Sequence, residues 1–313
     1  MTKLLLMFHS SNWASIIAFV SCTTLTPISL LGQGCSDAGF CSISSMKPNE
    51  ADSAYERKNQ IKTGVYYGQA SNAIVVYGNY LEYRRQLSSH MAIDFKLASL
   101  SQNGNGISTF GMADAIVNAS YRVNDHLFFS AGLKVPFDDG NQKLNGLSLP
   151  MDYQTSLGTT DLVLGFGYSF RRLQLVAGFQ QPITQNKNAF IADLYPKDSK
   201  IRNFQSTNQF ERSGDILLRA SYPVKLSNKL KLTPSILPIY HLSNDQFTDT
   251  KGDQKAIQGS QGLTLNGNLF ADIDFNTRNA IQINVGMPFI VREARPDGLS
   301  RSLVANLEYK IKF

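Results

Sequence analysis

The chain ends in the stretch Leu303-Val-Ala-Asn-Leu-Glu-Tyr-Lys-Ile-Lys-Phe313, which alternates between two kinds of side chain. Every odd-numbered position is apolar: Leu303, Ala305, Leu307, Tyr309, Ile311 and Phe313. The even-numbered positions after Val304 are polar or charged: Asn306, Glu308, Lys310 and Lys312. Because successive side chains of a β-strand point to opposite faces, this stretch predicts a strand with one apolar and one polar face.

A strand of this kind that closes a chain on an aromatic residue is typical of the outer-membrane β-barrels of Gram-negative bacteria. An edge strand of a soluble β-sandwich alternates in the same way, so the rest of the chain has to separate the two interpretations. Only 17% of the residues are charged, and the mean hydropathy is near zero at -0.17. No run of about 18 apolar residues occurs, which excludes a helical membrane protein. A barrel has such a composition because every second strand residue faces the lumen.

From residue 59 onward, long alternating segments are joined in pairs by very short polar turns. One pair turns at Asn124-Asp125-His126, another at Arg171-Arg172 and a third at Asn276–Arg278. The connections between the pairs are long and polar, at 138–158, 184–211 and 243–258. Transmembrane barrels combine short periplasmic turns with longer extracellular loops in this manner.

The pattern predicts twelve strands, at 59–70, 74–86, 90–101, 110–123, 127–137, 159–170, 173–183, 212–224, 229–242, 260–275, 279–292 and 300–313. Strands of a soluble sheet usually have about five or six residues, whereas a tilted strand needs about 9–11 to cross a bilayer. An even strand number brings both ends of the barrel to the same side, the periplasm. The sequence therefore predicts an all-β fold, a closed antiparallel transmembrane β-barrel of about 12 strands, in the outer membrane.

Residues 1–34 have the features of a secretory signal peptide. Lys3 supplies a positive start, 16–20 is apolar, and no acidic residue occurs before Asp37. Cleavage is expected near Gly32 to Gly34. Residues 35–58 are then a periplasmic N-terminal segment or plug, and 59–313 form the barrel, with both mature termini in the periplasm.

Two cysteines remain after such cleavage, Cys35 and Cys41. Two cysteines six positions apart in an oxidising compartment favour a small disulfide loop. Lipidation of Cys35 is an alternative, although the aliphatic residue expected three positions earlier is Gly32. A structural metal site would need further ligands nearby, and the surrounding sequence has no His or second Cys pair.

The positive charge of the chain, +6, is spread without a Lys or Arg block, so no nucleic-acid partner is predicted. No zinc motif, nucleotide fingerprint or catalytic triad is present, and no cofactor is expected. The spacing of Asp245, Asp249 and Asp253 does not match a calcium loop. The expected partners are outer-membrane lipids and a small-molecule solute.

His241 and Ser243 lie in the sequence Tyr-His-Leu-Ser-Asn-Asp. This resembles the His-x-Ser-Asn stretch of outer-membrane phospholipases and lipid A deacylases, in which a His activates a Ser, so a lipid hydrolase is an alternative function. The strand alternation opposes it, because it places both side chains in the lumen and not toward the lipid. The Gly that usually follows is Asp245 here.

The predicted lumen carries charges of both signs. Lys134, Asp161, Asp215 and Arg219 are the candidate pathway residues for a solute. Small inward residues such as Gly132 and Gly165 favour an open path, because side-chain volume decides whether so narrow a barrel conducts. Ion pairs that merely pack a structural, non-transporting barrel are the alternative interpretation.

The stretches Leu133-Lys-Val-Pro136 and Leu149-Pro-Met-Asp-Tyr-Gln-Thr-Ser-Leu-Gly-Thr-Thr-Asp-Leu-Val-Leu-Gly165 resemble the phenol-degradation meta-pathway transporters. That group is related to the long-chain fatty acid transporters. The resemblance is best over 110–183. It implies passive passage of small, often hydrophobic molecules through the barrel, with 35–58 as a plug shorter than the hatch of the fatty acid transporters.

Overall fold

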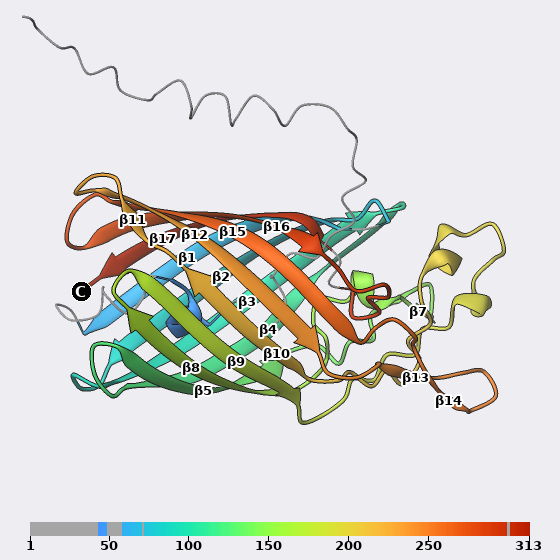
Figure 1. Ribbon diagram of the computed structural model, residues 1–313. Helices are drawn as coiled ribbons and strands as arrows, with labels where there is room; N and C mark the ends of the chain where they lie inside the picture. Colours follow the sequence, from blue (N-terminus) through green and yellow to red (C-terminus); the bar gives the residue numbers. More distant parts are fainter. Residues whose placement is uncertain (1–42, 49–57, 71, 299–300) are drawn as a thin grey trace, which may run out of the picture. The chain divides into compact units, whose positions relative to one another are not determined.

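The structure, a computed structural model, describes residues 43–48, 58–70, 72–298 and 301–313. The predicted signal peptide 1–34 and the predicted disulfide between Cys35 and Cys41 lie outside the described residues. Within these ranges, twelve long antiparallel strands form one closed barrel (Figure 1). In the same ranges, no helix has the length and apolarity needed to cross a bilayer.

The strands follow the chain around the barrel, each pairing with its neighbours in sequence. Their bounds are β1 Asn59–Ala70, β2 Val75–Gln86, β3 Met91–Gly104, β4 Ile107–Arg122, β5 Leu127–Pro136, β8 Asp161–Phe170, β9 Leu173–Pro182, β10 Asp215–Ser221, β12 Leu230–His241, β15 Gly262–Asp274, β16 Asn279–Ile290 and β17 Arg301–Lys312. The predicted all-β barrel is confirmed, and each predicted strand corresponds to one of these.

The first and last strands pair and close the barrel. The Asn59 N–H donates to the Phe313 carbonyl at 3.0 Å, and the Phe313 N–H donates back to the Asn59 carbonyl at 2.9 Å. β10 also pairs with β12, so the sheet has no open side. Closure satisfies the backbone groups that an open edge would expose to lipid.

Two strands differ from their predicted bounds for identifiable reasons. β3 and β4 extend toward each other through the turn at Asn105 and Gly106, whose φ angles of 52° and 78° suit an Asn-Gly hairpin turn. β10 is shorter than the predicted 212–224. It is followed by Pro223, which has no N–H to donate to a ladder, and then by the two-residue strand β11, Val224–Lys225.

The alternation of side chains gives the barrel an apolar outside and a polar inside. On β5, Phe129 and Leu133 are exposed on the outer face, whereas Ser130 and Lys134 are buried in the interior. The same holds on β16, where Ile283 is exposed and Gln282 is buried. A continuous apolar belt that lacks protein partners is what a bilayer requires of a barrel.

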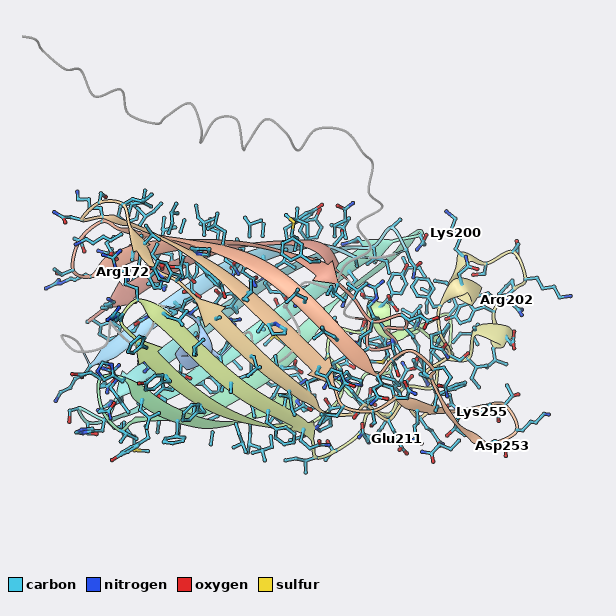
Figure 2. The ribbon with its side chains drawn as sticks, viewed as in Figure 1. Arg172, Lys200, Arg202, Glu211, Asp253 and Lys255 are labelled. Atoms are coloured by element: carbon cyan, nitrogen blue, oxygen red, sulfur yellow. The ribbon has the colours of Figure 1, made fainter. Side chains whose placement is uncertain are left out.

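The two ends of the barrel differ. The short-turn end carries Asn59, Phe313 and the tight turns, including the one at Arg172, and the loop end carries the long connections (Figure 2). At the loop end these connections contain β6 Lys143–Leu144, β7 Leu147–Ser148, η2 Met151–Tyr153, η3 Ala192–Leu194, η4 Lys200–Asn203, β13 Gln246–Thr248 and β14 Gln254–Ala256.

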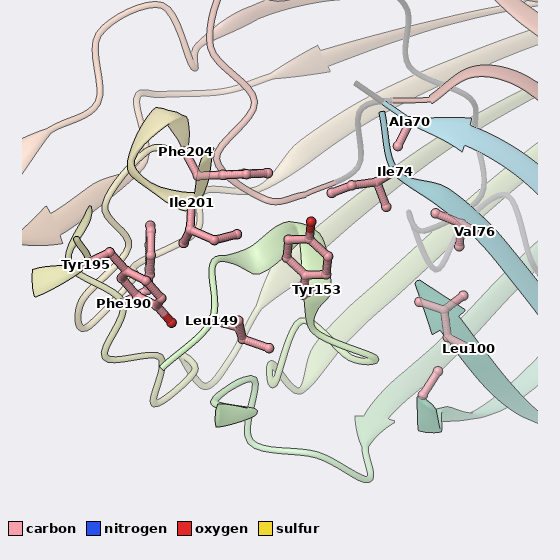
Figure 3. Packing of buried hydrophobic residues seen from close by; sticks show 11 residues of the cluster. Ala70, Ile74, Val76, Leu100, Leu149, Tyr153, Phe190, Tyr195, Ile201 and Phe204 are labelled. Carbon is pink, nitrogen blue, oxygen red and sulfur yellow. The ribbon is translucent and has the colours of Figure 1, made fainter. Parts of the chain in front are cut away.

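The long connections were predicted to be polar, but they fold into a loop cap with a buried core of its own. Tyr153, Phe190 and Phe204 pack with Ile74 and Leu100 from the tips of β2 and β3 (Figure 3). A second cluster joins Met151, Leu157, Phe210 and Ile257 from three different loops. The cap is therefore anchored to the barrel by apolar burial, which the overall polarity of these loops does not reveal.

Candidate functional site

The interior of the barrel has two chemically different walls. The apolar wall consists of five buried side chains on one half of the ring, Ile116, Val163, Val176, Leu217 and Leu237. The charged wall lies on β1, β2, β3 and β17, across the ring from β8 to β12 in the strand order, and consists of Lys62, Glu82, Arg84, Asp94, Lys96 and Glu308.

The charges of this wall are paired with one another. The Lys62 ammonium lies 3.3 Å from the Glu82 carboxylate, and the Arg84 guanidinium lies 2.7 Å from Asp94. The Lys96 ammonium lies over the Tyr80 ring, 3.9 Å from its centroid. Pairing of this kind is required of buried charges, because an isolated one would be too costly.

The short segment 43–48 lies between the two walls. Its one-turn 3-10 helix η1, Ser44–Met46, places Ile43 and Met46 against the apolar wall. Lys47 faces the other way and forms a 2.8 Å ion pair with Glu308. The segment is thus held by apolar contact on one side and by charge on the other.

Two hydrogen bonds hold the segment as well. The Asn118 amide donates to the Ser45 hydroxyl at 3.1 Å, and the Arg219 guanidinium donates to the Met46 carbonyl at 2.6 Å. Gly165 makes room for the segment, because a Cβ at that position would lie 2.3 Å from the Met46 methyl group. Cavities of about 30 and about 20 Å³ flank the segment, each with room for about one water. In this conformation, the segment occupies the lumen.

Lys134 and Asp161, two of the predicted pathway residues, form a buried ion pair near the loop end. The ammonium lies 3.0 Å from the Asp161 carboxylate and 3.9 Å from Asp114. The Gln180 amide donates to the same Asp161 oxygen, at 2.5 Å. Both charged groups are almost fully excluded from solvent.

Asp215 and Arg219, the other two predicted pathway residues, lie on the same strand but have different surroundings. Asp215 is at the loop end, where its carboxylate contacts Arg212 and lies 2.7 Å from the His241 ring. Arg219 lies deeper, beneath the segment 43–48. The structure therefore brings Lys134, Asp161 and Asp215 to the loop end of the interior and separates Arg219 from them.

His241 and Ser243, the pair required by the hydrolase alternative, have other partners. The two ring nitrogens of His241 lie 2.7 Å from Asp215 and 2.8 Å from Asp245. The Ser243 hydroxyl hydrogen-bonds to the Ser213 hydroxyl at 2.8 Å. A histidine engaged at both nitrogens is not positioned to take a proton from Ser243.

The loop cap contains a carboxyl group with an unusual proton affinity. Burial, with a smaller contribution from the nearby Asp297 carboxylate, raises the pKa of Asp152 to about 7. An exposed Asp ionises near pH 4, so the folded cap holds this proton over a range in which the unfolded chain has lost it. The docking of η2 therefore weakens as the pH rises from about 4 to about 7.

Several residues of the interior were not predicted from the sequence. Met46 and Lys47 belong to a segment without strand periodicity, and Arg212 and Asp245 belong to loops. Nothing in the local sequence separates a loop arginine that turns into the barrel from one that points to solvent. The only available signal was that the inward charges of the strands needed partners.

Comparison with solved structures supports the fold. The chain superimposes on an outer membrane channel from Pseudomonas putida F1 with a TM-score of 0.59 at 14% identity, over 85% of this chain and 99% of that one. The CymD monoaromatic hydrocarbon channel gives a TM-score of 0.45 at 12% identity, over 91% and 98%. A Pseudomonas aeruginosa FadL homologue gives 0.43 at 8%, over 90% and 100%.

No protein-family model matches the chain, and no curated protein matches it in sequence. The shared fold and the apolar outer belt nevertheless define the class of protein. The chain is a β-barrel of the Gram-negative outer membrane.

Proposed function

We propose that this barrel is a channel for the passive passage of small solutes, hydrophobic ones among them, across the outer membrane. The observation that carries the proposal is the two-walled interior, in which an apolar surface faces a row of paired charges and a short chain segment fills the space between them. The fold shared with an outer membrane channel supports it.

The segment 35–58 acts in this proposal as a plug, of which 43–48 is the part inside the barrel. It is attached to the walls by one ion pair, two hydrogen bonds and two apolar side chains. Such contacts can be exchanged for water and solute without breaking any strand pairing. Lys134, Asp161 and Asp215 would then meet the solute near the loop end, and Arg219 would meet it once the segment moves.

Export of the chain is part of the same proposal. Cleavage of 1–34 should leave a mature protein in which Cys35 and Cys41 are bridged, with both termini in the periplasm and the loop cap outside the cell. Mass spectrometry of the protein from outer membranes, without reductant, tests the first two points, and an acylated Cys35 would contradict the disulfide. Maleimide labelling of intact cells tests the third, using cysteines at the exposed positions Asn145, Lys197 and Thr250. Protection of all three would reverse the orientation.

Transport itself is tested by solute flux into liposomes. We expect the reconstituted protein to admit small aromatic and aliphatic solutes slowly and to admit them faster once residues 35–58 are deleted. A phospholipid hydrolysis assay on the same preparations addresses the alternative. Hydrolysis that disappears with Ser243→Ala would replace the channel by an enzyme, and the absence of both flux and hydrolysis would leave a structural barrel.

A further inference from the structure

Six ionisable side chains form a buried network where the barrel meets the loop cap. We call it the latch, and it consists of Arg212, Asp215, His241, Asp245, Arg292 and Asp297. Each of the six has less than a tenth of its surface exposed. The imidazole of His241 lies at its centre, 2.7 Å from one carboxylate and 2.8 Å from another.

The latch joins three separate connections of the loop end to the barrel wall. Arg212 comes from the β9–β10 connection and contacts Asp215 on β10. Asp245 comes from the β12–β15 connection, where it also accepts the backbone N–H of Ser213 at 2.9 Å. Asp297 comes from the β16–β17 connection and pairs with Arg292 at 2.8 Å.

Counting charges shows which form of His241 the latch requires. Three carboxylates face two guanidinium groups, so the six side chains are neutral only when the imidazole is protonated. The hydrogen bonds agree, because both ring nitrogens face carboxylate oxygens, which accept and cannot donate. The carboxylates stay ionised, since the guanidinium groups of Arg292 and Arg212 hold the pKa of Asp297 below its usual range although burial raises it.

We propose that the latch is a proton-operated lock, in which protonated His241 holds the loop cap closed and loss of its proton releases the cap. Without that proton, one ring nitrogen turns a lone pair toward a carboxylate, and the buried network carries a net negative charge. The further groups near it do not restore balance, because Lys134 is already paired with Asp161. The lock rests on the proposed function only for its consequence, the admission of solute.

The opening of the cap can be followed without any transport measurement. A Trp that replaces Phe204, which is buried in the cap, reports solvent access through acrylamide quenching, and Leu194→Trp on the same connection is the exposed control. The measurement runs from pH 7.5 to pH 9.5, where Asp152 is mostly ionised throughout. Once the imidazole titrates, the open population should rise about tenfold per pH unit, so quenching of the buried reporter increases while the control stays constant.

Charge-balancing variants separate the lock from a general loosening at high pH. His241→Gln leaves the network one charge negative and should be open at pH 7.5. Asp245→Asn balances it with a neutral imidazole and should stay closed to pH 9.5, and the double variant should also stay closed. The exposed His126, changed to Gln, is the matched control. A wild-type reporter that does not respond to pH, or an Asp245→Asn barrel that opens like the wild type, overturns the proposal, and neither outcome depends on whether the barrel conducts.

Discussion

Met46→Lys should turn a closed barrel into a conducting one. Met46 is fully buried against the apolar wall, and its carbonyl already receives the Arg219 guanidinium. An ammonium at this position would sit among aliphatic side chains and beside a like charge. The same ammonium is well hydrated once the segment 43–48 leaves the lumen, so the whole cost falls on the docked state.

The balance of docking is narrow enough for one residue to reverse it. Burial of Ile43 and Met46 contributes about 3–6 kcal/mol, whereas fixing the backbone of six residues costs about 6–12 kcal/mol. The Lys47–Glu308 pair and the hydrogen bonds make up the difference. Loss of the Met46 contact and burial of a charge should cost at least about 3 kcal/mol, which shifts the docked population more than about 100-fold.

Single-channel recording in planar bilayers measures this effect as the fraction of time spent conducting. Met46→Leu conserves the volume and should remain closed, since such swaps usually cost less than about 1.5 kcal/mol. Ser227→Lys adds the same charge at an exposed turn of the short-turn end and serves as the matched control. If Met46→Lys conducts no more than Met46→Leu, the segment is not the gate.

Asp161→Asn should give the largest loss of stability among the interior positions. The change leaves Lys134 buried with only the more distant Asp114 carboxylate, at 3.9 Å, as a partner. Removal of one member of a buried ion pair typically costs about 3–5 kcal/mol, because the remaining charge is uncompensated. The residual Asp114 contact places the expected loss near the lower limit, about 3 kcal/mol. Urea unfolding of the barrel in lipid vesicles measures it.

The control for this variant removes both charges. Lys134→Met combined with Asp161→Leu should recover most of the stability, because a hydrophobic pair of similar volume can replace a buried ion pair at little cost. Asp274→Asn, at an exposed strand end, should be close to neutral. The double variant also separates the two roles of the pair. If it is stable but changes the ion selectivity of the opened barrel, the pair lines the pathway, and if selectivity is unchanged the pair only packs the wall.

The sequence by itself determined the barrel. Alternation along 303–313 and its counterparts on the other strands carries the fold, because a side-chain period of two assigns every residue of a strand to lipid or to lumen. The inward positions of Lys134, Asp161, Asp215 and Arg219 followed from the same parity. Strand bounds departed from the pattern only where a local rule intervened, at the Asn105-Gly106 turn and at Pro223.

Only the tertiary structure decided which of these charges meet. The partners of Asp215 are Arg212, three residues earlier in a loop, and His241, from the adjacent strand β12. Glu308 is paired with Lys47, 261 positions away. Parity assigns a side chain to a face, but it does not give the height at which strands align or the path of a loop that folds back. Those depend on the closure of the sheet and on the apolar core of the cap, which are properties of the whole chain and of no single segment.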